Sequence, residues 1–334
     1  MVRRKLLLLL VLVLVLGAAL AFTSVAVAGN GGFAPETPRS PNANRINDSY
    51  KLIAVFTGGI FLVVEGSLLW FIFRYRNRGR ARSVEGPQIF AHSRLELIWT
   101  LIPVLIVAAI SAFVFYKLPG IKDVPSAKAQ GGPLVIRIDA HQFYWQFTYP
   151  NGAVSIDELR APVHRTVRVN IVSHDVDHSW WIPELGGKFD AIPGQRTHTW
   201  FKADKVGTYV GKCGEFCGVF HAEMEAEVKV TPKREYERWI DHGAAAALGR
   251  SEWEGVCAKC HGLHGEGGYG PQIANNQLLV QQAGLRTLLL NGQNIMRPTA
   301  NYMPPVSRGW NEKQFDALFA YLKTSVYKGT SRGG

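Results

Sequence analysis

Three long apolar stretches stand out in the first third of the chain. The first follows Arg3, Arg4 and Lys5 and ends in Ala-Val-Ala before Gly29, an order typical of a cleavable secretory signal peptide, so we assign residues 1–28 to one. Residues 52–73 and 97–116 are each long enough to cross a bilayer as a helix. We therefore predict export followed by a transmembrane hairpin over residues 46–118. The alternatives are an uncleaved membrane anchor at the start and a pair of buried helices in a soluble domain.

The connection between the two predicted spans fixes their orientation. Every second residue from Arg74 to Arg82 is arginine, and the positive-inside rule places such a loop in the cytoplasm. The chain after Pro119 is then extracytoplasmic. Two carboxylates, Glu65 within the first span and Glu96 at the edge of the second, are costly in lipid and are expected to face protein or water.

Short runs with period-two alternation replace the apolar spans after Pro133. These runs cover residues 134–139, 141–149, 166–172 and 222–230, with Gly, Pro and Asp turns between them. This pattern predicts an all-β sandwich or barrel over residues 131–232. On a strand over 141–149, the aromatic positions His141, Phe143, Trp145 and Phe147 would share one face. That face would either pack in a core or form a partly exposed patch where electrons enter.

Charge and cysteine content narrow the class of protein. The net charge of +11 comes partly from arginines beside apolar spans, where they indicate which side of the membrane a loop occupies. We therefore do not expect nucleic acid as a partner. The four cysteines form two close pairs, Cys213 with Cys217 and Cys257 with Cys260. That number is too small for a disulfide scaffold and indicates cofactor sites.

The run CGEFCGVFHAEM, residues 213–224, places soft metal ligands on one loop. Two thiolates, an imidazole and a thioether favour copper, and two thiolates can bridge a pair of copper ions. A second imidazole is needed, and residues 173–194 offer His174 and His178. A disulfide and a tetrahedral zinc site are the alternatives.

A third domain follows a connector over residues 233–249. Cys257, Cys260 and His261 form the CxxCH signal for covalent attachment of a c-type haem, with His261 as an axial ligand. Met303 and Met296 are the candidates for the second axial ligand. Residues 311–324 have the pattern of a closing amphipathic helix, so we predict an all-α domain over residues 250–328.

These motifs resemble subunit II of haem–copper cytochrome c oxidases fused to a cytochrome c domain, the caa type. The loop at 213–224, the run DVxHSWxxPxLGxKxDAIPG at 175–194 and the hairpin carry the likeness, which covers residues 46 to about 231. The resemblance implies a cupredoxin-like Greek-key sandwich holding the binuclear CuA centre. The implied copper ligands are His178, Cys213, Glu215 through its backbone carbonyl, Cys217, His221 and Met224.

The resemblance also implies roles outside the copper ligands. It assigns the side chain of Glu215 to a magnesium ion shared with subunit I, and Glu96 to the mouth of a proton pathway. It favours Met303 as the haem ligand, and gives Pro271 the carbonyl that orients the axial histidine. Phe143 departs from the family, which usually has tryptophan there as the point where electrons enter.

The function implied by the resemblance is electron relay within a proton-pumping oxidase of the bacterial plasma membrane. Electrons would pass from cytochrome c or another donor through the haem and CuA to subunit I, which reduces oxygen. This multi-pass chain would contact the other oxidase subunits and lipid, and would carry no catalytic residue of its own. The alternatives are a membrane-anchored electron carrier without an oxidase, a quinol-oxidase subunit II and the CuA domain of nitrous oxide reductase. The intact Cys213 and Cys217 pair disfavours the quinol type, and the length of 334 residues disfavours the reductase.

Overall fold

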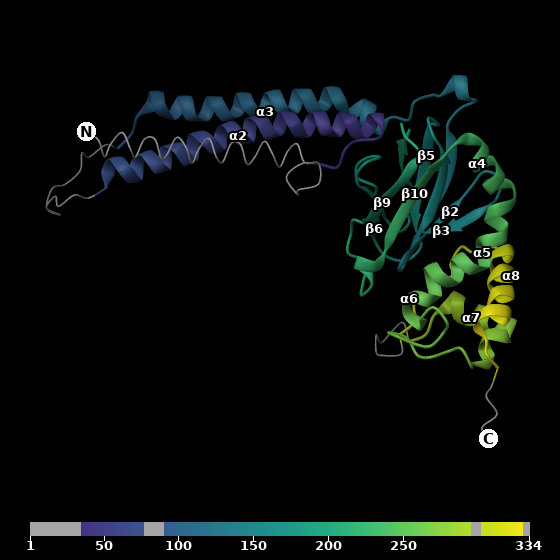
Figure 1. Cartoon of the computed structure of the whole chain (residues 1–334). Helices are drawn as coiled ribbons and strands as arrows, with labels where there is room; N and C mark the ends of the chain where they lie inside the picture. The colour runs from purple at the N-terminus through teal and green to yellow at the C-terminus, as the bar shows by residue number, and fades with distance from the viewer. Residues whose placement is uncertain (1–34, 77–89, 295–301, 330–334) are drawn as a thin grey trace, which may run out of the picture. The chain divides into compact units, whose positions relative to one another are not determined.

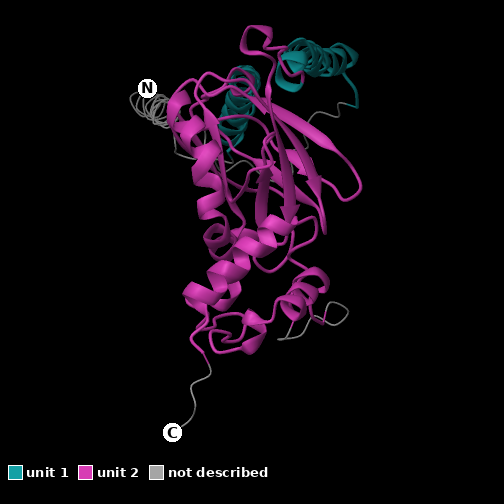
Figure 2. Cartoon of the chain, turned by 90° about the vertical axis from the view of Figure 1, so that its right-hand side faces the viewer, with its two compact units in different colours: residues 1–35, 44–122 teal, residues 36–43, 123–334 magenta. Residues whose placement is uncertain are grey.

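The computed structural model describes residues 35–76, 90–294 and 302–329 (Figure 1). The predicted signal peptide, most of the arginine-rich loop and Met296 lie outside the described residues. The chain divides into two units (Figure 2), the first over residues 1–35 and 44–122 and the second, here called unit 2, over residues 36–43 and 123–334. Each unit is described by itself.

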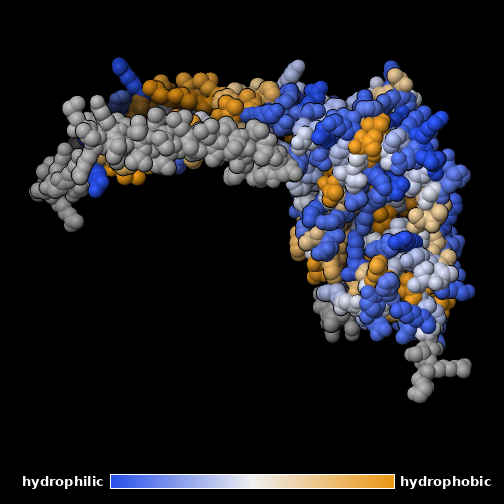
Figure 3. Space-filling model, in the orientation of Figure 1, coloured by the Kyte–Doolittle hydropathy of each residue, from blue (hydrophilic) through white to orange (hydrophobic). Residues whose placement is uncertain are grey.

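The first unit contains the predicted hairpin. Helix α2 spans Pro41–Tyr75, its first three residues belonging to unit 2, and α3 spans Ser93–Lys122. Both are long and apolar enough to cross a membrane, and the part of their surface that is visible in Figure 3 is mostly orange, the colour of hydrophobic residues. The Lys117 ammonium contacts the Asp48 carboxylate at 2.7 Å and joins the two helices. Glu96, in the first turn of α3, accepts a hydrogen bond from the His92 backbone N–H at 3.0 Å.

Unit 2 begins with a sandwich of two five-stranded sheets, as the alternating pattern predicts. The first sheet has the order β3-β2-β1-β5-β8 and the second β4-β10-β9-β6-β7. Their bounds are β1 Leu134–His141, β2 Tyr144–Thr148, β3 Val154–Ile156, β4 Glu158–Pro162, β5 Val167–Ser173, β6 His178–Trp181, β7 Phe189–Ala191, β8 Thr197–Phe201, β9 Gly207–Cys213 and β10 Glu225–Thr231. Alternate side chains of β5 and β9 are buried, so one face of each strand packs into the core between the sheets.

The prediction of a single strand over residues 141–149 is wrong, because the chain turns within this run. A turn at Gln142 and Phe143 separates β1 from β2, which then pair as neighbours with His141 opposite Tyr144. The four aromatic positions therefore do not lie along one strand. Phe143 is 8% exposed, so it is a packed residue and not a partly exposed patch.

Helices follow the last strand. They are α4 Lys233–Arg238, α5 Ala244–Glu252, α6 Ala258–His261, α7 Gln282–Asn291 and α8 Glu312–Tyr321, with π-helical segments at Trp239–Gly243, Trp253–Cys257 and Leu322–Val326. Asn311 and Gln314 form a capping box at the start of α8, which explains where the predicted closing helix begins. Phe315, Leu318 and Leu322 are buried together in a second core, distinct from the core of the sandwich.

Candidate functional site

The candidate copper ligands lie close together because the start of strand β6 lies beside the end of its neighbour, strand β9. β9 ends at Cys213, and its neighbour β6 begins at His178, with Trp180 in register opposite Cys213. The loop from Gly214 returns through Met224 into β10, and the Cys213 N–H donates to the Met224 carbonyl at 2.9 Å. Two rigid neighbouring strands and one loop thus bring residues far apart in the sequence into one cluster.

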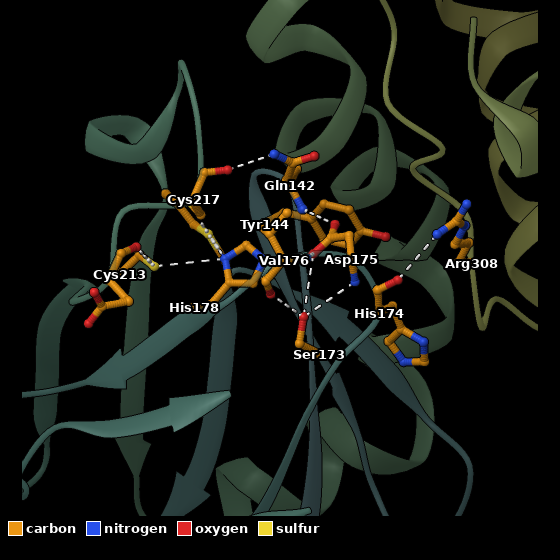
Figure 4. Close-up of polar contacts among 12 residues, drawn as sticks. Gln142, Tyr144, Ser173, His174, Asp175, Val176, His178, Cys213, Cys217 and Arg308 are labelled. Carbon is orange, nitrogen blue, oxygen red and sulfur yellow. Dashed lines mark hydrogen bonds and ion pairs between the residues drawn. The ribbon is translucent and has the colours of Figure 1, made fainter. Parts of the chain in front are cut away.

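The distances within this cluster suit a shared metal site (Figure 4). His178, Cys213 and Cys217 each offer a ligand atom, and these atoms lie within 4.8 Å of one another. His178 Nδ1 lies 3.8 Å from Cys213 Sγ and 3.2 Å from Met224 Sδ. Both cysteines are buried free thiols. The donor set of two thiols, imidazole and thioether fits soft copper ions, because thiolate and thioether ligands favour copper over hard cations.

The remaining predicted ligands surround the same thiols. His221 Nδ1 lies 3.5 Å from Cys217 Sγ, and the Glu215 carbonyl oxygen lies 3.2 Å from Cys213 Sγ. Met224 is fully buried, with its sulfur 3.8 Å from Cys217 Sγ. The Glu215 carboxylate instead points to Lys188, whose ammonium lies 2.9 Å away. The structure therefore gathers the other four predicted copper ligands around the Cys213 and Cys217 thiols, while His174 lies elsewhere.

The electrostatics of the two thiols favour a negatively charged site. The pKa of Cys213 is lowered to about 4, because Cys217 donates a hydrogen bond to its thiolate and His178 adds a second contact. The same contact raises the pKa of Cys217, since a second thiolate would form beside the first. A cation bound between them would remove that penalty, as metal ions deprotonate the thiols that coordinate them.

Asp175 orients His178, a role that the sequence analysis did not assign. Its carboxylate lies 2.8 Å from His178 Nε2 and also accepts the Gln142 N–H at 2.6 Å. Burial alone would lower the pKa of His178, but the hydrogen bonds to Asp175 and Cys213 raise it. Since Nε2 is held by Asp175, Nδ1 is the nitrogen left for a metal. The only sequence signal was the position of Asp175 in the 175–194 motif.

His174 belongs to a different group of rings. Its Nε2 lies 2.6 Å from Asp139 Oδ1, and its ring stacks on His141 with centroids 4.7 Å apart. His141 stacks in turn on Tyr144, also at 4.7 Å, and among the described residues its ring nitrogens have no hydrogen-bond partner. Burial, assisted by repulsion from His174, lowers the pKa of His141 to about 3.

The buried His141 predicts weaker folding in acid. In the unfolded chain His141 binds a proton below its ordinary pKa of about 6.5, whereas in the folded chain it stays neutral down to about pH 3. Between these two values the proton stabilises only the unfolded state, so the free energy of unfolding falls as the pH falls. The contribution is about 1.4 kcal/mol per pH unit within that window. We expect His141→Phe, which keeps a stacked ring, to flatten the pH dependence of urea unfolding between pH 6 and 4. The exposed His242→Phe variant is the control, and equal slopes for both variants would contradict this role of His141.

The CxxCH motif lies beside the second core, where one helical segment ends and the next begins. Cys257 ends one π-helical segment, and α6 carries Cys260 and His261. His261 Nδ1 lies 2.9 Å from the Pro271 carbonyl oxygen, a contact that fixes the ring and leaves Nε2 for an iron ion. Burial raises the pKa of Cys257 to about 12 and also raises that of Cys260, so both remain neutral thiols.

Met303 forms a backbone bridge with Gln293 and packs against the second core. Its N–H and carbonyl pair with Gln293 at 2.9 and 2.8 Å, and its side chain packs against the same core as Cys257 and Ala258. The chemistry of these side chains fits a covalently attached haem with His and Met ligands. The two cysteines are half-buried thiols, His261 is an oriented imidazole, and Met303 offers a thioether at the same apolar core. Met296 cannot be compared with Met303, because it lies outside the described residues.

Comparison with protein-family models agrees with the three-part organisation. Residues 30–116 match the transmembrane domain of cytochrome c oxidase subunit II, and residues 153–231 match its periplasmic domain. Residues 244–322 match the model described as cytochrome c oxidase, cbb3-type, subunit III.

Individual relatives carry the same description. Cytochrome c oxidase subunit 2 of Alkalihalophilus pseudofirmus is 29% identical over 309 residues, which cover 86% of this chain and 89% of the relative. The probable cytochrome c oxidase subunit 2 of Rickettsia conorii is 30% identical, over 61% of this chain and 70% of its own length. The solved periplasmic domain of cytochrome oxidase subunit II from Bradyrhizobium japonicum is 32% identical, with 37% of this chain and 97% of that domain covered and a TM-score of 0.34. The chain belongs to the family of cytochrome c oxidase subunit II, and it carries a cytochrome c domain after the copper-binding domain.

Proposed function

We propose that this chain relays single electrons from a cytochrome donor, through a covalent haem c and a binuclear CuA centre, to the oxygen-reducing subunit I of a proton-pumping oxidase. The observation that carries the proposal is the cluster of His178, Cys213 and Cys217, whose ligand atoms lie within 4.8 Å of one another. Membership of the subunit II family gives that cluster its context.

The proposed ligands form two sites, one for copper and one for haem. Cys213, Cys217, His178 and His221 would hold the two copper ions, with Met224 and the Glu215 carbonyl as weaker ligands. Cys257 and Cys260 would attach the haem, and His261 and Met303 would ligate its iron. The haem and copper groups supply one-electron redox chemistry when bound. The protein orients their ligands, through Asp175 at His178 and through the Pro271 carbonyl at His261.

The proposed domain limits are residues 131–232 for the copper domain and 250–328 for the haem domain, with the connector over 233–249 and the signal peptide over 1–28. The Glu215 carboxylate, 47% exposed and paired with Lys188, is available to a magnesium ion shared with subunit I. The copper and haem domains are proposed to face the extracytoplasmic side of a bacterial plasma membrane. The partners are subunit I, the other oxidase subunits and a cytochrome donor.

The proposal is tested by isolating the full chain from membranes under mild conditions. We expect a multi-helix haem–copper subunit to copurify, and the preparation to consume oxygen when reduced cytochrome c is added. Isolation of the chain alone, with its redox groups but without oxygen consumption, would favour the alternative of a membrane-anchored electron carrier.

A further inference from the structure

The outer face of strand β2 is buried by the helices that follow the sandwich. Trp145 and Phe147 point into the core between the sheets, whereas Tyr144 on the opposite face belongs to the second core with Trp310 and Phe315. The Tyr144 hydroxyl donates to the Val306 carbonyl and accepts from Trp310 Nε1 at 2.9 Å. Strand β2 is therefore covered on both faces, and both domains contribute to its burial.

A hydrogen bond between two buried side chains forms a second polar contact between strand β2 and the helices. Gln314 on α8 donates through Nε2 to Gln146 Oε1 at 2.9 Å, and both side chains are buried. Buried amides that satisfy each other fix one geometry, because any displacement leaves donors and acceptors without partners. A haem domain that detached freely would expose Tyr144 and leave these groups without their partners.

Lys259, inside the haem-attachment motif, reaches across to the sandwich. Its ammonium donates to Asp157 Oδ2 at 2.6 Å and to the Phe143 carbonyl at 3.0 Å. Asp157 lies between β3 and β4, and its other oxygen accepts the Trp145 N–H at 2.8 Å. The two charged side chains are only 22% and 23% exposed, so this is a partly buried ion pair and not a solvated surface contact. Burial raises the pKa of Asp157, and Lys259 opposes that rise.

The turn that Lys259 contacts also touches the copper-ligand loop. Gln142 Nε2 donates to the Cys217 carbonyl at 2.6 Å (Figure 4), and its Oε1 accepts from the Tyr302 hydroxyl at 3.4 Å. Gly218, at φ 133°, allows this approach, because a Cβ there would lie 3.0 Å from Gln142 Nε2 and from the Phe143 ring. The turn Gln142–Phe143 thus contacts Cys217, a proposed copper ligand, on one side and the haem domain on the other.

Aromatic rings form a second line of contact. Phe143 packs edge-on against Phe220 at 5.6 Å, and Phe220 packs against Tyr269 of the haem domain at 4.8 Å. The Phe143 ring is therefore packed against Phe220 of the copper-ligand loop, and Phe220 in turn contacts the haem domain through Tyr269.

We propose that Lys259 is a positioning residue that locks the haem-attachment turn onto the Gln142–Phe143 turn. This inference depends on the proposed function. The haem domain then works in a fixed, docked position and not as a swinging carrier. The contact between the two turns would then set the path for one electron from a bound haem, which would be oxidised, to a bound copper centre, which would be reduced.

The test uses the full chain in its oxidase complex and the variant Lys259→Met, which keeps the length of the stem but removes the charge. After photochemical reduction of the haem, we expect electron transfer to copper to slow about tenfold, within the roughly hundredfold that a misplacement of about 1 Å can cost a geometry-dependent step. The copper and haem spectra should be unchanged. Hydrogen exchange should rise in residues 253–261, a readout independent of oxidase activity.

Matched variants keep the result interpretable. Lys313→Met makes the same charge change at an exposed position of α8 and should leave rate and exchange unaltered. Lys259→Arg should restore most of the rate. Asp157→Asn, which keeps an oxygen for the Trp145 N–H, should slow transfer as Lys259→Met does, and the double variant should be no slower than either, because the two act as one pair.

Two results would overturn the inference. An unchanged rate in Lys259→Met with intact spectra would remove the positioning role while leaving the proposed function in place. Unchanged hydrogen exchange in residues 253–261 of Lys259→Met would likewise show that Lys259 does not lock the haem-attachment turn. Absence of the copper or haem signal from the unmodified chain would instead contradict the proposed function, and this inference with it.

Discussion

Replacing Cys217 with serine should remove the copper centre from the chain while the haem absorbance stays unchanged. The Cys217 sulfur lies 3.5 Å from His221 Nδ1 and 3.8 Å from Met224 Sδ, so it joins the loop ligands to His178 and Cys213. A serine hydroxyl is a hard, protonated donor that cannot bridge two soft metal ions. We expect copper content to fall from about two ions per chain to less than one, in line with the loss of a bridging ligand.

The reciprocal variant is the control for this result. Cys260→Ser should disrupt covalent attachment of the haem while copper content and the copper spectrum remain, because Cys260 belongs to the haem domain. Metal analysis and visible absorption of both purified variants measure the two effects. Retention of full copper by Cys217→Ser, or loss of both groups from either variant, would contradict the assignment of two separate sites.

Replacing Met303 with leucine should change the axial ligation of the haem without disturbing copper. Met303 packs on the same core as Cys257 of the CxxCH motif, and its backbone is paired with that of Gln293. Leucine has a similar volume, which limits the loss of packing free energy to less than about 1.5 kcal/mol. A thioether ligand raises the haem potential, so its loss should lower the potential by on the order of tenths of a volt.

Spectroelectrochemistry of the haem measures this prediction, and the copper signal of the same sample shows whether the fold is intact. Met296→Leu is the matched variant and should leave the haem potential unaltered. A shift in Met296→Leu together with no shift in Met303→Leu would transfer the ligand role to Met296.

The features that could be predicted from sequence are those encoded locally. The hairpin follows from two apolar runs, the sandwich from period-two alternation, and the haem and copper motifs from ligands that are close together in the chain. The family motif also distinguished His178 from His174, and in the structure only His178 lies beside Cys213 and Cys217.

The features that escaped prediction depend on contacts between distant segments. The turn at Gln142–Phe143 was hidden in an uninterrupted aromatic run, whose residues are buried on both sides because two domains share strand β2. No local pattern pairs Lys259 with Asp157, which are 102 residues apart. Asp175 stands three residues before His178, yet its contact with that ring depends on the bend between β5 and β6.

The most direct test of the central claim is metal analysis combined with electron paramagnetic resonance of the native full chain. We expect two copper ions that share one unpaired electron, together with one covalently bound haem per chain. A disulfide between Cys213 and Cys217, or a zinc ion held by them, would contradict it.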